Sequence, residues 1–147
     1  MRIVVGADHG GYRLKEEIAR FLAGEGYEVE DVGTFDEEST DYPDYAVQVA
    51  RVVAEGRADL GILVCGTGIG MSIAANKIKG VRAALATDGY MARMAREHND
   101  ANVLCLGGRV LGVGLALEVV RAFLESRFAG GRHARRVGKI EAIERGG

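Results

Sequence analysis

The fold is decided by the stretch Leu60-Gly-Ile-Leu-Val-Cys-Gly-Thr-Gly-Ile-Gly-Met-Ser-Ile-Ala-Ala-Asn76. Its first part, Leu60 to Val64, is a short apolar run bounded by Asp59 and by glycines, which is typical of a buried strand in a parallel sheet. The three glycines that follow let the backbone turn tightly and approach a ligand. A short helix is predicted from Met71 to Asn76. The stretch therefore predicts a strand, a loop whose amides face a crevice, and a helix in direct succession.

Cys65 lies at the carboxyl end of this strand, and its thiol has two interpretations. A free cysteine is most often a small buried hydrophobic residue. At the mouth of a parallel strand, beside the amide donors of a helix start, its thiolate form is instead favoured and it can act as a base or nucleophile. The same amides can stabilise an oxyanion on a neighbouring carbon. The location favours the chemical interpretation, and the glycine spacing fits neither a dinucleotide fingerprint nor a Walker loop.

The composition restricts the class of protein. The chain has 147 residues, of which 48% are hydrophobic, and we expect residues 1–147 to form a single globular domain. A formal net charge of -2 gives no electrostatic reason to expect a nucleic-acid partner. No apolar run suits a bilayer, and the first residues resemble a strand more than a signal peptide, so we expect no membrane partner and a cytoplasmic location. The two cysteines form no C-x-x-C pair, so both are expected to be free thiols.

Strands and helices are predicted to alternate along the whole chain. Strands are expected at residues 2–7, 28–32, 60–64, 81–86 and 103–106, and helices at 12–25, 41–53, 71–76, 88–97, 111–126 and 132–145. Asp41 and Asp88 are the expected N-caps, and Lys15 is assigned to the polar face of the first helix. The alternation predicts an α/β fold: a three-layer, doubly wound, five-stranded parallel sheet of flavodoxin- or Rossmann-like type, with an extra C-terminal helix.

A flavodoxin-like strand order of 2-1-3-4-5 has a consequence for the cysteines. One strand would separate Cys65 from Cys105, so they would lie at least about 9 to 10 Å apart. A disulfide could not form across that distance. Cys105, among apolar neighbours, is expected to be a core residue.

Three loops are expected to converge at the carboxyl edge of the sheet: those with Asp8-His9, with Cys65 to Ser72, and with Arg109. Asp8 and His9 alone could equally be a loop carboxylate and a surface imidazole, but their position beside Cys65 favours a functional role. His98 differs, because histidine is favoured at the end of a helix for structural reasons. Its position in the sequence therefore favours a capping role.

The final helix supplies a basic patch, formed by Arg132, His133, Arg135 and Arg136 in its first turns. Cations at a helix N-terminus oppose the macrodipole, so an anion is expected nearby. Arg132 and Arg136 share one helix face and can clamp a phosphate, with Arg109 as a third arm. Together with a thiolate base and a loop of amide donors, this patch predicts an isomerisation through an enediolate on a small phosphorylated substrate. The reaction requires no metal and no redox cofactor.

Beyond these arguments, the sequence resembles the type B ribose-5-phosphate isomerases, which are grouped with galactose-6-phosphate isomerase subunits. The resemblance covers nearly the whole chain. It is carried by the motifs Gly6-Ala-Asp-His9, Thr40-Asp-Tyr-Pro-Asp44, Cys65 to Asn76, His98-Asn-Asp-Ala-Asn102 and Gly130-Gly-Arg-His133 with Arg136. The resemblance implies an aldose–ketose isomerase of the pentose phosphate pathway that interconverts ribose 5-phosphate and ribulose 5-phosphate without a metal or cofactor.

The resemblance also implies roles for individual residues. Cys65 would move the proton between C2 and C1, Thr67 would assist it, and His98 would be the acid/base that opens the furanose ring. The residues expected to bind the substrate are Asp8, His9, Tyr42, Gly66, Gly68, Ile69, Gly70, Ser72, Asn99, Arg109, Arg132 and Arg136. Of these, His9 and the three arginines are assigned to the phosphate.

The resemblance further implies a homodimer or homotetramer whose sites are shared between subunits. The apolar face of residues 111–124 and the final helix are the expected contact surfaces. Two alternatives for the function stay open. One is the same chemistry on a six-carbon sugar phosphate, such as allose or galactose 6-phosphate. The other is a non-catalytic, flavodoxin-like module that only binds a phosphate-bearing ligand and for which Cys65 is dispensable.

Overall fold

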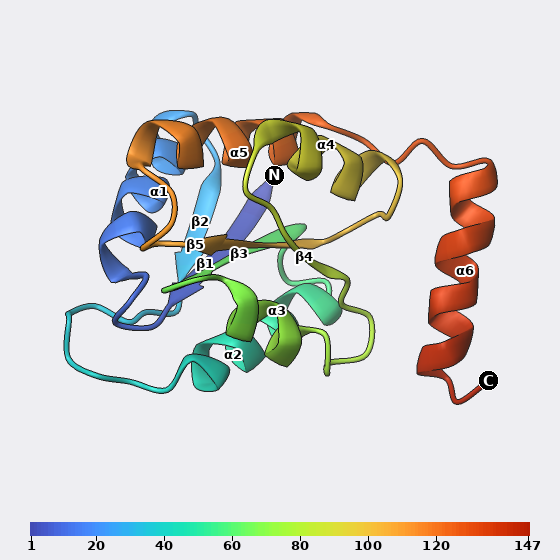
Figure 1. Cartoon of the computed structure of the whole chain (residues 1–147), viewed down its shortest axis with the longest axis horizontal. Helices are drawn as coiled ribbons and strands as arrows, with labels where there is room; N and C mark the ends of the chain where they lie inside the picture. Colours follow the sequence, from blue (N-terminus) through green and yellow to red (C-terminus); the bar gives the residue numbers. More distant parts are fainter.

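In the computed structural model, which describes residues 1–147, five parallel strands form one sheet between two layers of helices (Figure 1). The strands are β1 (Arg2–Ala7), β2 (Glu28–Asp31), β3 (Leu60–Cys65), β4 (Ala83–Leu85) and β5 (Val103–Gly107). The helices are α1 (Tyr12–Gly24), α2 (Tyr42–Ala54), α3 (Ile69–Ala75), α4 (Gly89–Glu97), α5 (Val113–Glu125) and α6 (Arg132–Glu144). The predicted three-layer α/β fold with an extra C-terminal helix is confirmed.

The central strand β3 explains how the layers are held together. Helices α1, α4 and α5 cover one face of the sheet, and α2 and α3 cover the other (Figure 1). Leu60, Ile62 and Val64 pack into the core on the first face. Leu63 and Cys65 belong to the core on the second face. Because a parallel strand at the centre of such a sheet buries side chains on both faces, it needs a continuous apolar run, as β3 has.

The strand order is β2-β1-β3-β5-β4, which corrects the predicted order 2-1-3-4-5. All five residues of β5 are buried, whereas the three residues of β4 are only partly buried, so β4 takes the edge. Since β5 pairs directly with β3, no strand separates Cys65 from Cys105; Leu63 lies opposite Cys105, and Cys65 opposite Gly107. Both thiols are free. Cys105 is fully buried, as expected, and burial raises the pKa of its thiol.

The predicted helix caps have different outcomes. Asp88 caps α4, because its carboxylate accepts a hydrogen bond from the amide of Met91 at 2.8 Å. Asp41 stands at the N-cap position of α2, but its side chain makes no capping hydrogen bond. The elements predicted at residues 81–86 and 111–126 are shorter in the structure, where they form β4 and α5.

Lys15 of α1 is fully buried, which corrects its assignment to the polar face of that helix. Its Nζ donates to both carboxylate oxygens of Asp31, at 2.9 and 2.8 Å, and to Glu16 at 2.9 Å. The same nitrogen lies 4.7 Å from the ring centroid of Phe35. The ion pair therefore fastens α1 to the end of β2.

The helices α5 and α6 differ in how they use their apolar residues. The apolar side of α5, which includes Val119 and Phe123, is buried within its own chain, so the expectation that this face contacts another subunit is wrong. Helix α6 stands apart from the other helices, at the right of Figure 1, and leaves Ile140 and Ile143 exposed. None of the helices combines the length and apolar character that crossing a membrane requires.

Candidate active site

The carboxyl ends of β1, β3 and β5 lie side by side, and the three loops that follow them meet there, as predicted (left of Figure 1). The amide of Gly108 donates to the carbonyl of Cys65 at 2.8 Å, and the amide of Arg109 donates to the carbonyl of Gly66 at 3.0 Å. Gly10 approaches the same loop so closely that a Cβ added to it would lie 3.1 Å from the nitrogen of Gly66. Asp8-His9, Cys65 to Ser72, and Arg109 therefore share one edge of the sheet.

Cys65 is the last residue of β3, and its sulfur lies at the start of α3. The amide of Gly68 donates to Sγ at 3.2 Å, and 5% of the Cys65 surface is exposed. Gly68 has φ +82°, and a Cβ there would lie 2.7 Å from the side chain of Leu85, so the turn requires glycine. This turn starts α3 at Ile69 rather than at the predicted Met71. The sulfur at the end of β3 is therefore within hydrogen-bond reach of a main-chain donor.

The other predicted residues of this loop maintain its shape. The Thr67 hydroxyl accepts a hydrogen bond from the amide of Ile69 at 3.2 Å, and the Ser72 hydroxyl donates to the carbonyl of Ile69 at 2.7 Å. Tyr42 of α2 packs against the loop, because a Cβ on Gly70 would lie 2.5 Å from its ring. Thr67 and Ile69 are exposed, so the loop presents both to a ligand.

Asp8 and His9 follow β1 and are held by different partners. The Asp8 carboxylate is 7% exposed and accepts hydrogen bonds from the amides of the next two glycines at 2.9 and 3.2 Å. Nδ1 of His9 accepts a hydrogen bond from the amide of Thr40 at 3.1 Å, so Nε2 carries the hydrogen and can donate it to an anion. His9 and Arg109 both line a cavity of about 360 Å³. No group of three or more His, Cys, Asp or Glu side chains is arranged to hold a metal ion.

The remaining predicted residues, His98, Asn99, Arg132 and Arg136, lie at the opposite edge of the sheet. Helix α4 begins beyond the carboxyl end of β4 and runs back to the amino end of β5, so His98 is placed where the strands begin. The six-residue strand β3 spans roughly 20 Å from edge to edge. One chain therefore does not bring His98 and Cys65 together.

His133 at the start of α6 lies beside His98 but was not among the predicted site residues, although it belongs to the basic patch and to the motif Gly130-Gly-Arg-His133. Its ring stacks on that of His98, with centroids 4.1 Å apart and planes inclined by 9°. Burial, followed by the nearby His98, Arg132 and Arg136, lowers the pKa of His133. The two arginines are exposed. The stacking depends on how α6 packs against α4, and the signals in the sequence were the position of His133 in the basic run and in the motif Gly130-Gly-Arg-His133.

The chain has close relatives among known proteins. The Ribose/Galactose Isomerase family profile matches residues 3–140. Ribose-5-phosphate isomerase B of Escherichia coli is 52% identical over 143 residues, which make up 97% of this chain and 96% of that protein. The structure of Clostridium thermocellum ribose-5-phosphate isomerase B has a TM-score of 0.98 at 60% identity and covers 99% of this chain and 98% of that one.

A structure with bound ligand is also similar. Mycoplasma genitalium ribose-5-phosphate isomerase B with bound ribulose-5-phosphate has a TM-score of 0.94 at 43% identity and covers 98% of this chain and 96% of that one. Such similarity over the full length excludes the alternative of a non-catalytic binding module. The chain is therefore an isomerase and belongs to the ribose/galactose isomerase family.

Proposed function

We propose that this isomerase interconverts ribose 5-phosphate and ribulose 5-phosphate, with Cys65 as the base. The observation that carries the proposal is the 3.2 Å hydrogen bond from the Gly68 amide to the sulfur of Cys65, at the edge where His9 and Arg109 line a cavity. This arrangement places a sulfur that accepts a main-chain hydrogen bond at the same edge as donors for a phosphate. The activity named for the Escherichia coli relative and the ribulose 5-phosphate bound to the Mycoplasma genitalium relative support this substrate.

In the proposed reaction, the Cys65 thiolate removes the proton from C2 of the open-chain aldose. A C1–C2 double bond forms as the carbonyl electron pair moves onto O1, which gives an enediolate. The proton of the C2 hydroxyl moves to O1, and the Cys65 thiol returns its proton to C1 as O2 becomes the carbonyl oxygen of the ketose. The amides of residues 66–70 and the Thr67 hydroxyl stabilise the negative oxygen, because preorganised donors act strongly where charge develops. Cys65 must remain reduced, which supports a cytoplasmic location as part of the proposal.

The other predicted residues bind the substrate or prepare it. His98 takes the hydrogen from O1 of the furanose and donates one to the ring oxygen, which opens the ring, and Asn99 binds near the enediolate. Arg132 and Arg136 join His9 and Arg109 on the phosphate. Asp8, Tyr42, Ile69 and Ser72 contact the sugar.

This assignment requires two copies of the chain, because His98 and Cys65 lie at opposite edges of one sheet. We propose a homodimer in which the end of α4 and the start of α6 of one copy complete the Cys65 site of the other. Two observations support a second copy as the partner: α6 stands apart from the other helices, and it leaves Ile140 and Ile143 exposed, at 48% and 70%. A homotetramer would repeat the same contact.

Replacing Cys65 tests the proposed base. Both C65S and C65A remove the thiolate, so we expect kcat for ribose 5-phosphate to fall by about 10³-fold, with KM within about threefold of wild type. The matched control is C105A, which removes the other thiol from the core and should retain kcat. Thermal unfolding of each variant checks that the fold is intact. Wild-type turnover by C65A would contradict the role of Cys65.

A six-carbon sugar phosphate is the second candidate substrate, and it is favoured by the inclusion of galactose in the family description. A longer sugar moves the phosphate one carbon farther from the reacting C2, so the same pocket cannot suit both lengths equally. We expect kcat/KM for ribose 5-phosphate to exceed that for allose or galactose 6-phosphate by about tenfold or more. The reverse preference would replace the five-carbon assignment.

A further inference from the structure

Asp100 ends α4 with an unusual backbone conformation. Its φ is +48°, and it is the only residue other than glycine with a positive φ. Glycine is the usual residue at such a helix end, because a side chain makes the left-handed region unfavourable. The amides of Asp100 and Ala101 donate to the carbonyls of Arg96 and Ala95, at 3.2 and 2.9 Å, which completes the last turn. An aspartate in a position that suits glycine indicates a function for its carboxylate.

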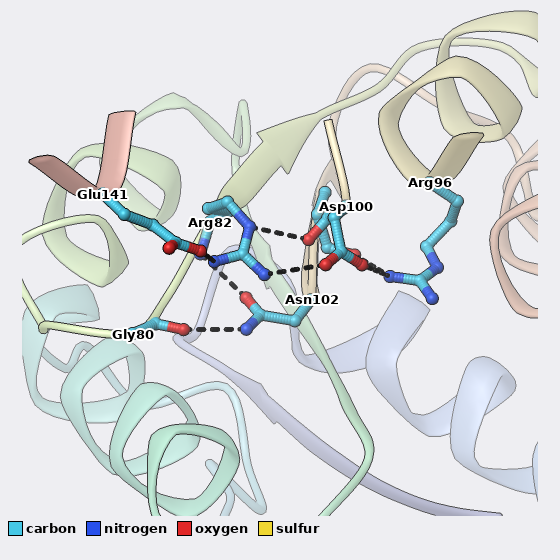
Figure 2. Close-up of polar contacts among 7 residues, drawn as sticks. Gly80, Arg82, Arg96, Asp100, Asn102 and Glu141 are labelled. Carbon is cyan, nitrogen blue, oxygen red and sulfur yellow. Dashed lines mark hydrogen bonds and ion pairs between the residues drawn. The ribbon is translucent and has the colours of Figure 1, made fainter. Parts of the chain in front are cut away.

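Two arginines hold that carboxylate from opposite sides (Figure 2). Nη1 of Arg96 lies 3.3 Å from Oδ1, and Nη2 of Arg82 lies 3.3 Å from Oδ2. The same arginines also hold the backbone: Arg82 donates to the carbonyl of Asp100 at 2.8 Å, and Arg96 donates to that of Ala101 at 2.5 Å. The two arginine side chains are 21% and 16% exposed and the Asp100 side chain is 34% exposed, so the network is partly shielded from water. The direction of the chain after His98 is thereby fixed.

The network also reaches α6. Figure 2 shows Glu141 of α6 on the side of Arg82 away from Asp100, and Nη1 of Arg82 lies 3.7 Å from Oε1 of Glu141. Farther along the helix, Glu144 accepts a hydrogen bond from the amide of Gly80 at 3.0 Å. Asn102 ties the segment after α4 to residues 80–82. Its side chain accepts a hydrogen bond from the amide of Arg82 and donates one to the carbonyl of Gly80, both at 2.8 Å.

The other end of α6 contacts His98 directly, through the stacked ring of His133. The segment of residues 98–102 therefore contacts α6 directly at His98 and indirectly through Arg82, which pairs with both Asp100 and Glu141. We propose that Asp100 is a positioning residue: its carboxylate, held by Arg82 and Arg96, orients His98 for ring opening and couples it to α6. This proposal rests on the proposed function, since it assigns to His98 the opening of the sugar ring.

A double-mutant cycle with His98 tests the proposal. D100G permits the left-handed backbone but removes the carboxylate, so we expect kcat for ribose 5-phosphate to fall by about tenfold, as misplacing a catalytic group does. H98Q should retain measurable turnover, because the furanose also opens spontaneously in solution. If Asp100 acts through His98, D100G should change kcat by less than about twofold in the H98Q background.

The conservative variant D100N is the matched control. Asparagine tolerates the same backbone and keeps one acceptor oxygen, so we expect kcat to stay within about threefold of wild type. A D100G variant with wild-type kcat would overturn the proposal, and so would equal losses from D100G in both backgrounds, which would indicate a merely structural role. A wild-type chain that turns over no sugar phosphate would overturn the proposed function as well, so the two failures are distinguishable.

Discussion

Cys65 and Cys105 lie on neighbouring strands and belong to the same half of the core, yet their surroundings differ. Cys105 is enclosed in the middle of β5, where burial raises the pKa of its thiol and keeps it protonated. Cys65 is at the end of β3, where the amide of Gly68 reaches its sulfur. The position along a strand, rather than the residue type, thus separates a core thiol from one suited to chemistry.

His133 makes stability depend on pH. Its pKa is lowered in the folded chain, mainly by burial, so the unfolded chain takes up the proton first as the pH falls. This contribution to stability is present above the unfolded pKa of about 6.5 and is lost below it. We expect the melting temperature of H133F, which keeps an aromatic ring on His98, to fall less than that of wild type between about pH 7.5 and about pH 5.5. Equal falls in the melting temperatures of wild type and H133F would contradict this expectation.

The chemistry of single residues was predictable where it followed from position on a strand. Cys65, Asp8, His9 and Arg109 lie together because the carboxyl ends of parallel strands share an edge. Lys15 was not predictable as a buried residue, because helical spacing alone does not show that Asp31 approaches from the neighbouring strand.

At the scale of elements, α1 depends on its buried lysine. K15M fills the same space but leaves the Asp31 carboxylate without its cationic partner, with only the amide of Gly33 still donating to it, and we expect the free energy of unfolding to fall by about 2 to 3 kcal/mol. R20M on the same helix breaks only the exposed pair with Glu17 and should cost less than about 0.5 kcal/mol. Urea unfolding measures the free energy of unfolding of both variants. The double variant K15M/D31N should recover part of the loss, whereas K15M as stable as R20M would show that the pair contributes little.

The order of the last two strands was not predictable from chain order. Both β4 and β5 come from short apolar runs, and the simplest assumption is that successive strands are neighbours. The run at residues 81–86 contains Arg82, however, whose charge is difficult to bury at the centre of a sheet. That arginine was the available signal for an edge strand, and in the structure it forms the network around Asp100.

At the scale of the whole molecule, the candidate site is divided between the two edges of one sheet. Pattern and motif analysis named the residues without showing this division. A helix that follows a parallel strand returns to the opposite edge, so the end of α4 was bound to lie away from Cys65. The separation of His98 from Cys65 could have been derived from the order of the elements along the chain. The second chain that would bring them together cannot be seen in a single sequence.

Mixing two impaired variants, one that lacks the base and one that keeps only weak turnover, tests the division. In the proposed dimer, a C65A chain and an H98Q chain together form one site with both residues intact and one site with neither. We expect mixtures refolded or exchanged at equal amounts to recover about a quarter of wild-type activity, because half of the dimers are mixed and one of their two sites works. Each variant alone, treated in the same way, is the control. No recovery after verified exchange would contradict a site built from two chains.

The placement of His98 and Cys65 at opposite ends of a rigid sheet has a consequence for regulation. In the proposed assembly, a chain diluted below the dissociation constant of its dimer would keep its sheet and its core but lose turnover. Protein abundance would then act as an on–off control, without any effector molecule and without unfolding.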